Sequence, residues 1–111
     1  MFRTILCAVA MAGLMMGAAE AAGLMIVRHE VADYAKWRPA FDADVANQQA
    51  AGLTNPRVYQ AAGDPGDVTI LFDMADLAKA QAFGASDALK AAMMKAGVTG
   101  KPEVSFLNPA P

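Results

Sequence analysis

The stretch RVYQAAGDPGDVTILFDM, Arg57 to Met74, decides the fold of this 111-residue chain. Arg57–Ala61 and Val68–Met74 contain the β-branched and aromatic residues that favour strands. Between them lies Ala62–Asp67, in which glycine, proline and aspartate favour a turn. The stretch therefore predicts an antiparallel β-hairpin near the middle of the chain.

Upstream of this hairpin, the sequence predicts one strand followed by one helix. The strand is Leu24–Val31, which is rich in β-branched residues. Asp33 can cap the helix that follows it. The helix has one apolar stripe whose members recur every four residues, namely Trp37, Phe41 and Val45. Pro39 should kink this helix or confine its first turn to a separate segment, because proline lacks the N–H that bonds back four residues.

Downstream of the hairpin, the sequence predicts a second helical region and a last strand. Asp76 and Ser86 can each cap a helical segment. Gly97 and Gly100 are expected to end this region, and Glu103–Leu107 reads as the fourth strand. The order β-α-β-β-α-β is the ferredoxin-like arrangement of the α+β class. Two helices then cover one face of a four-stranded antiparallel sheet.

Apolar residues occur on both faces of the predicted strands. Within Val68–Met74 the even-numbered residues are all apolar and point one way, whereas Leu71 lies on the opposite side. In the first strand, Leu24 and Ile26 lie opposite Met25 and its alternating neighbours. The sheet face without helices therefore also has apolar side chains to cover. A second copy of the same sheet is the economical cover, which predicts a homodimer.

The N-terminal segment, residues 1–21, has the pattern of a cleavable secretory signal. Arg3 supplies the positive charge, an apolar and small-residue run follows, and an A-x-A site predicts cleavage between Ala21 and Ala22. The apolar run is shorter than the roughly 18–20 residues that span a bilayer. We therefore expect a signal peptide, then a single domain over residues 22–111, in a mature protein that is periplasmic or secreted.

Composition excludes several classes of function. The formal net charge is −2 and no basic run is present, which argues against nucleic acid or an anionic membrane as a partner of the mature form. The single cysteine, Cys7, lies in the expected signal, so thiol redox chemistry and thiolate metal sites are not expected. There is no phosphate-binding loop, dinucleotide fingerprint or H-E-x-x-H motif. The sequence thus predicts no cofactor and no metal.

Several stretches resemble a known superfamily, and they span most of the mature domain. They are VRHEVADYAKWRPAFD (Val27 to Asp42), RVYQAAGDPGDVTILFDMADLAKAQAF (Arg57 to Phe83) and SDALKAAMMKAGVTGKPEVSFL (Ser86 to Leu107). They resemble the dimeric α+β barrel superfamily that includes the antibiotic-biosynthesis-monooxygenase-like proteins. The resemblance implies a ferredoxin-like protomer whose sheet pairs with a partner's sheet to form a barrel. That superfamily includes cofactor-independent oxygenases, haem-degrading enzymes, isomerases and small-molecule binders, so the fold does not specify the reaction.

His29 and Tyr59 are the candidate catalytic residues. His29 is the only histidine, and its ordinary pKa is the one closest to neutrality. It shares a side of its strand with Val27 and Val31, so it is either a proton shuttle at a pocket wall or a neutral, hydrogen-bonded core histidine. Tyr59 combines an aromatic ring with a polar tip. A single histidine is no evidence for a haem or metal site.

The remaining candidates are aromatic and sulfur-containing side chains that would bind a ligand between the helices and the sheet, or else fill the core. The candidate ligand-binding residues are Trp37, Phe41, Phe72, Phe83 and Met93. The first hypothesis is an exported protein that binds a small apolar or aromatic molecule. The alternative is a cofactor-independent monooxygenase or isomerase acting on an aromatic or quinone-like substrate, with His29 or Tyr59 moving a proton. Export favours binding, because it separates the domain from NAD(P)H and most cytoplasmic reductants.

Overall fold

The computed structural model describes residues 23–111, and the expected signal peptide, residues 1–21, lies outside the described residues. The elements in chain order are β1 (Gly23–Val31), α2 (Tyr34–Ala43), α3 (Val45–Ala50), β2 (Leu53–Ala61), β3 (Asp64–Met74), α4 (Leu77–Gly84), α5 (Asp87–Lys95) and β4 (Val98–Leu107). This order confirms the ferredoxin-like α+β class, with each predicted helix divided into two. Within residues 23–111, no helix is long and apolar enough to cross a bilayer.

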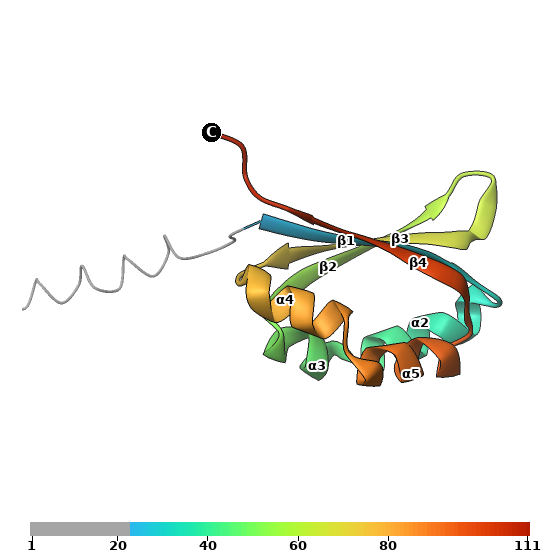
Figure 1. The fold of residues 1–111 in the computed structure, drawn as a ribbon. Helices are drawn as coiled ribbons and strands as arrows, with labels where there is room; N and C mark the ends of the chain where they lie inside the picture. Colours follow the sequence, from blue (N-terminus) through green and yellow to red (C-terminus); the bar gives the residue numbers. More distant parts are fainter. Residues whose placement is uncertain (1–22) are drawn as a thin grey trace, which may run out of the picture.

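The strands form one antiparallel, four-stranded sheet in the order β2-β3-β1-β4. All of the described helices lie on one face of this sheet (Figure 1). The two central strands are β1 and β3, where Val27 pairs with Ile70, and Val27 also faces Val104 on β4. The middle of β1 therefore lies beneath the helices with a strand on each side, which places its inward side chains at the centre of the domain.

The predicted alternation of the two central strands is confirmed. Every second residue of β1, and the residues of β3 that alternate with Thr69 and Leu71, are buried beneath the helices. With Trp37, Ala51, Leu53 and Ala80, they make the core: Met25, Val27, Val31, Val68, Ile70, Phe72 and Met74. The intervening residues lie on the face that carries no helix, as expected for a period of two.

The alternative in which Pro39 confines the first helical turn to a separate segment is wrong, whereas a kink at Pro39 stays a prediction. Helix α2 continues through Pro39, and the chain breaks at Asp44, where φ is −92° and ψ is 5°. The carbonyl that Pro39 leaves without an N–H partner belongs to the exposed Ala35, so water can bond to it. Beyond the break, other residues face the core than the apolar stripe predicted. Val45, expected on that stripe, is 40% exposed, whereas Gln48 is buried.

The predicted six-residue turn between the hairpin strands is also wrong. Only Ala62 and Gly63 separate β2 from β3, and β3 starts at Asp64. Strand β3 pairs with β1 only as far as Asp67, so the hairpin end extends past the rest of the sheet (Figure 1). There β3 has a partner on one side alone, and Pro65 can lie in the strand because proline is tolerated where a ladder N–H is not needed.

Two other strands begin earlier than predicted, β2 at Leu53 and β4 at Val98. Gly100, expected to precede the last strand, lies inside β4 with a φ of +71°, which favours glycine. The pairing of β1 with β4 shifts register between Arg28 and Glu30, opposite this glycine. The extra residues form a bulge, which sequence patterns do not reveal because they record alternation and not pairing.

We predict that Ile70→Ala lowers the free energy of unfolding by about 2–5 kcal/mol, since it removes most of a side chain that is 2% exposed. Urea denaturation followed by circular dichroism measures the change. The matched control is Thr69→Ala on the opposite face of the same strand, which should cost about 0.5 kcal/mol or less. Equal losses in the two variants would contradict the assignment of the faces.

Candidate functional site

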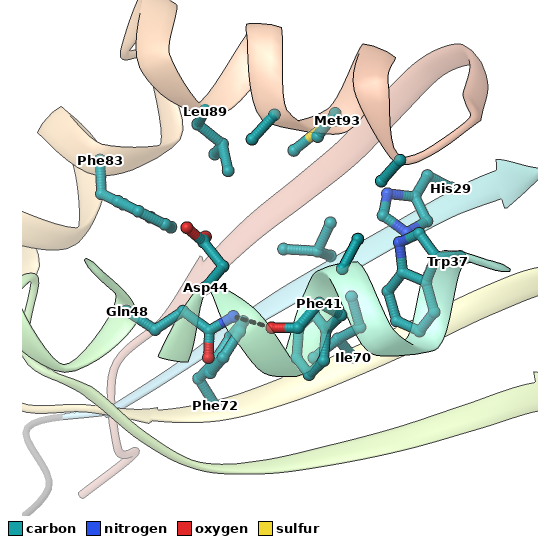
Figure 2. A pocket seen from close by; sticks show the side chains of 14 residues that line it. His29, Trp37, Phe41, Asp44, Gln48, Ile70, Phe72, Phe83, Leu89 and Met93 are labelled. Carbon is teal, nitrogen blue, oxygen red and sulfur yellow. Dashed lines mark hydrogen bonds between the residues drawn. The ribbon is translucent and has the colours of Figure 1, made fainter. Parts of the chain in front are cut away.

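A cavity of about 60 Å³ lies between the helices and the inward face of the sheet. Its floor is made by β1 and β3, one wall by α2, and the opposite wall by α4 and α5 (Figure 2). The lining is mostly apolar, with polar side chains from three positions: His29, Asp44 and Gln48. An apolar chamber with a few polar groups is typical of a small-molecule site.

The residues predicted to bind a ligand come together in this cavity. All of them line it, although they belong to four different elements: Trp37, Phe41, Phe72, Phe83 and Met93. Whether they contact a ligand stays a prediction. The sequence analysis missed Asp44 and Gln48, because their positions depend on the break between α2 and α3, and the only local signal was the capping potential of aspartate.

His29 lies at one end of the cavity, in contact with Trp37 (Figure 2). Its side chain is 6% exposed, and the two rings meet edge to face with centroids 5.6 Å apart. Neither ring nitrogen has a hydrogen-bond partner within the described part of the chain. Burial lowers the pKa of the His29 imidazole, so the neutral form is favoured, which has one N–H donor and one acceptor nitrogen.

Tyr59, the second catalytic candidate, does not lie with His29. It is opposite Thr69 on the sheet face that carries no helix, and it is 57% exposed. Its neighbour Val58 pairs with Ile70 and packs against the core, so alternation along β2 turns Tyr59 the other way. A proton transfer by Tyr59 would therefore take place on the outer face and not in this cavity.

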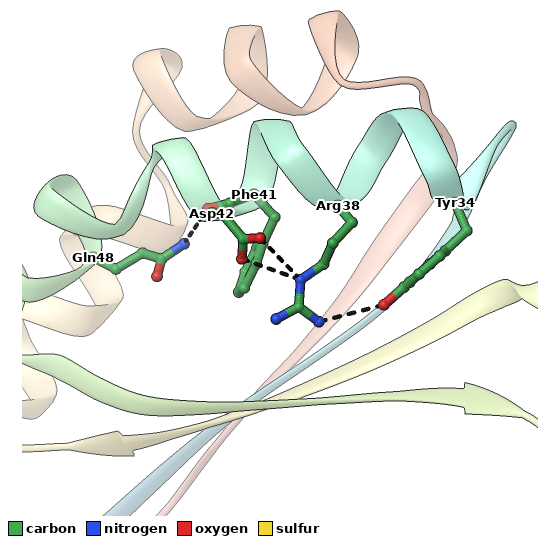
Figure 3. A network of polar contacts seen from close by, with 5 residues as sticks. All are labelled: Tyr34, Arg38, Phe41, Asp42 and Gln48. Carbon is green, nitrogen blue, oxygen red and sulfur yellow. Dashed lines mark hydrogen bonds and ion pairs between the residues drawn. The ribbon is translucent and has the colours of Figure 1, made fainter.

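The α2 wall is an aromatic stack fixed from outside by polar contacts. Trp37 and Phe41 are stacked with centroids 4.9 Å apart, and Phe41 reaches Phe72 at 6.1 Å. On the same helix, the guanidinium of Arg38 donates to Asp42 at 3.1 Å and to the Tyr34 hydroxyl at 3.3 Å (Figure 3). These contacts span the helix from its first turn to its last and limit its fraying.

A second polar contact of this wall lies at the break between α2 and α3. Gln48 is 3% exposed, and its side-chain amide donates to the backbone carbonyl of Phe41 at 3.4 Å (Figure 3). The Asp44 N–H donates to the same carbonyl at 3.1 Å. The break therefore keeps its polar groups bonded while it turns the chain between α2 and α3.

A groove of about 510 Å³ adjoins the cavity and lies between α3 and the α4–α5 pair. The cavity and the groove share Asp44, Phe83, Leu89 and Ala92. The remaining walls of the groove are largely alanine. Because alanine side chains fill little space, we infer that a ligand enters the cavity between the α2–α3 and α4–α5 helix pairs.

The described residues offer no obvious cation site. Over residues 23–111, no group of three or more histidine, cysteine, aspartate or glutamate side chains could hold a metal ion. Near the hairpin end, the Arg28 guanidinium donates to Asp67 at 2.7 Å and holds the pKa of that carboxyl below its usual range. What the cavity offers chemically is an apolar volume with a neutral imidazole, a carboxylate and an amide in its lining.

No protein-family model and no curated protein matches the chain, but solved structures share its fold. One antibiotic biosynthesis monooxygenase is 14% identical over 79% of this chain and 98% of its own, with a TM-score of 0.59. SnoaB, a cofactor-independent oxygenase from Streptomyces nogalater, is 11% identical over 78% of this chain and 93% of its own, with a TM-score of 0.58. A Streptomyces coelicolor monooxygenase from the gene ActVA-Orf6, in complex with nanaomycin D, is 15% identical over 82% of this chain and 89% of its own, with a TM-score of 0.54. The chain thus has the α+β fold of the antibiotic-biosynthesis-monooxygenase-like proteins, as the resemblance implied.

The burial of His29 makes stability depend on pH. The unfolded chain takes up a proton near pH 6.5, whereas the folded chain resists it, so acidification below about 6.5 favours unfolding. We expect the free energy of unfolding to fall by up to about 1.4 kcal/mol per pH unit until the lowered pKa is reached. Urea denaturation at a series of pH values measures this slope, and His29→Gln should reduce it. Identical slopes in the two proteins would show that His29 does not cause it.

Proposed function

We propose that this protein binds one small apolar or aromatic molecule in the cavity between the helices and the sheet. The observation that carries the proposal is His29, whose ring nitrogens are buried in an aromatic chamber and have no hydrogen-bond partner among residues 23–111. Buried polar atoms are nearly always hydrogen-bonded, and exceptions concentrate at sites of function. A ligand with a hydroxyl or carbonyl group would supply the missing bond while its apolar part lies among the aromatic rings.

Binding requires the cavity to widen. An apolar cavity of about 150 Å³ accommodates benzene, whereas this one measures about 60 Å³. Phe83 and Leu89 line both the cavity and the adjoining groove, so rotation of these two side chains would join the two spaces. The ligand is therefore expected to displace them as it enters from the groove.

A second copy of the chain is proposed to cover the face without helices. That face presents Leu24, Ile26, Leu71 and Leu107 across three neighbouring strands, and Leu107 is 44% exposed. Pairing two such faces would bury this apolar surface, as is common for exposed patches of this kind. Export to the periplasm or the medium, with removal of residues 1–21, completes the proposal and rests on the sequence pattern alone.

Native mass spectrometry of the protein recovered from the periplasm tests these points together. We expect a chain beginning at Ala22, a dimer, and an additional mass from a bound small molecule that is lost after denaturation. His29→Gln, which keeps hydrogen-bonding capacity, should retain the dimer and bind with little loss of affinity. A ligand-free monomer would contradict both the dimer and the binding site, and a chain that retains residues 1–21 would contradict export.

A second candidate function is cofactor-independent oxygenation or isomerisation of an aromatic or quinone-like compound. The neutral imidazole of His29 favours it, because such a group accepts a proton from a phenolic hydroxyl bound within reach. The electron-rich phenolate would then react with molecular oxygen while the protein holds it in place. SnoaB, described as a cofactor-independent oxygenase, has a similar fold.

Oxygen consumption with a naphthohydroquinone as substrate distinguishes this function from binding. If His29 is the base, His29→Ala should lower the rate over the buffer background by about 100-fold or more. Lys36→Ala is the matched control, since Lys36 is exposed on α2 and does not line the cavity. A rate that is the same in both variants, or no greater than in buffer, would leave binding as the function.

A further inference from the structure

The end of the cavity away from His29 is defined by a carboxylate that the sequence analysis did not single out. Asp44 occupies the break between α2 and α3 and is half-buried. It lines the cavity, the large groove, and a second groove on the α2 and α5 side. Figure 2 shows its carboxylate between Gln48 and Phe83, directed across the space and not out from the helix. Asp44 therefore lies where the cavity meets the two grooves.

The Asp44 carboxylate uses only one of its two oxygens in side-chain hydrogen bonds to described residues. Its Oδ1 accepts a hydrogen bond from the Asn47 side-chain amide at 2.7 Å. The ion pairs found within residues 23–111 join Arg28, Arg38 and Arg57 to other acids, so none of them involves Asp44. Lys79 and Lys95 line the adjoining grooves but not the cavity itself. Among residues 23–111, no side-chain donor bonds to the other oxygen, Oδ2, so it can receive a donor from a ligand.

The two polar groups are well separated by apolar side chains. His29 contacts Trp37, and Asp44 follows Trp37 along α2 by seven residues, a rise of about 10 Å. Phe41 lies between these ends and contacts Phe72 on the floor, with Met93 on the facing wall (Figure 2). The chamber is thus apolar along its length, with a neutral hydrogen-bonding group at the closed end and a negative charge at the open end.

We propose that the ligand is an elongated amphiphile with a hydroxyl or carbonyl group at one end and an amine at the other. The first group would bond to His29, the apolar body would lie along the aromatic wall, and the ammonium would pair with Asp44. An amine suits Asp44 because a partly desolvated carboxylate attracts cations and repels anions. This inference rests on the proposed function and adds the charge and orientation of the ligand to it.

Three probes of equal length test the inference: 4-pentylphenol, 4-(4-aminobutyl)phenol and 4-(4-hydroxyphenyl)butanoic acid. Trp37 is the only tryptophan, so quenching of its fluorescence reports on binding in the cavity. We expect the amine to bind about fivefold more tightly than the neutral phenol, and the acid to bind more weakly than both. The preference for the amine should shrink at high salt.

Variants assign the preference to one residue. Asp44→Asn keeps the acceptor that Asn47 uses, so the fold is retained, and the amine should lose its advantage over the neutral phenol. Asp87→Asn removes the same charge from an exposed position on α5 that lines neither the cavity nor the two grooves, and the advantage should remain. An advantage that survives Asp44→Asn, or amine and neutral probe binding equally to the unmodified protein, overturns the inference but leaves the proposed function. If no probe binds, the proposed function fails as well.

Discussion

The stack of Trp37 on Phe41 sets the distance between α2 and the sheet, and the shape of the cavity follows from it. The rings lie 4.9 Å apart, and Phe41 extends the contact to Phe72 on β3. Such large rings hold the helix backbone away from the strands, so the small side chains of Ala40 and Ala92 cannot fill the space that remains. The same rings therefore make the core contact and leave the cavity beside it.

The division of each helical region into two gives the domain an entrance. The breaks fall at Asp44 and Ala85, and alanine is the commonest residue lining the groove between the α2–α3 and α4–α5 pairs. Alanine contacts bury little apolar area, so separating the two helix pairs costs less than opening an interface of larger side chains. Access to the cavity can thus arise from local motion of the helices while the hydrogen-bonded sheet stays intact.

His29 is where stability and function oppose each other. Among the described residues, its ring nitrogens are the buried side-chain polar atoms that lack a partner. Each such group costs about 1–3 kcal/mol when it is desolvated without a hydrogen bond. An apolar residue at this point of β1, between Val27 and Val31, would pack without that cost. A ligand group that bonds to the imidazole recovers part of it, which links the occupancy of the cavity to the stability of the fold.

The sequence by itself determined the α+β class, the element order and the inward faces of β1 and β3, because alternation and capping are local properties of the chain. It also identified the aromatic residues of the cavity, since large apolar side chains on inward faces must meet. Only the tertiary structure decided the break at Asp44, the burial of Gln48 and the exposure of Val45. These depend on how α2 and α3 fit over a sheet whose strands are distant in sequence. The lone imidazole was visible from the start, but its missing partner is a property of the packed domain.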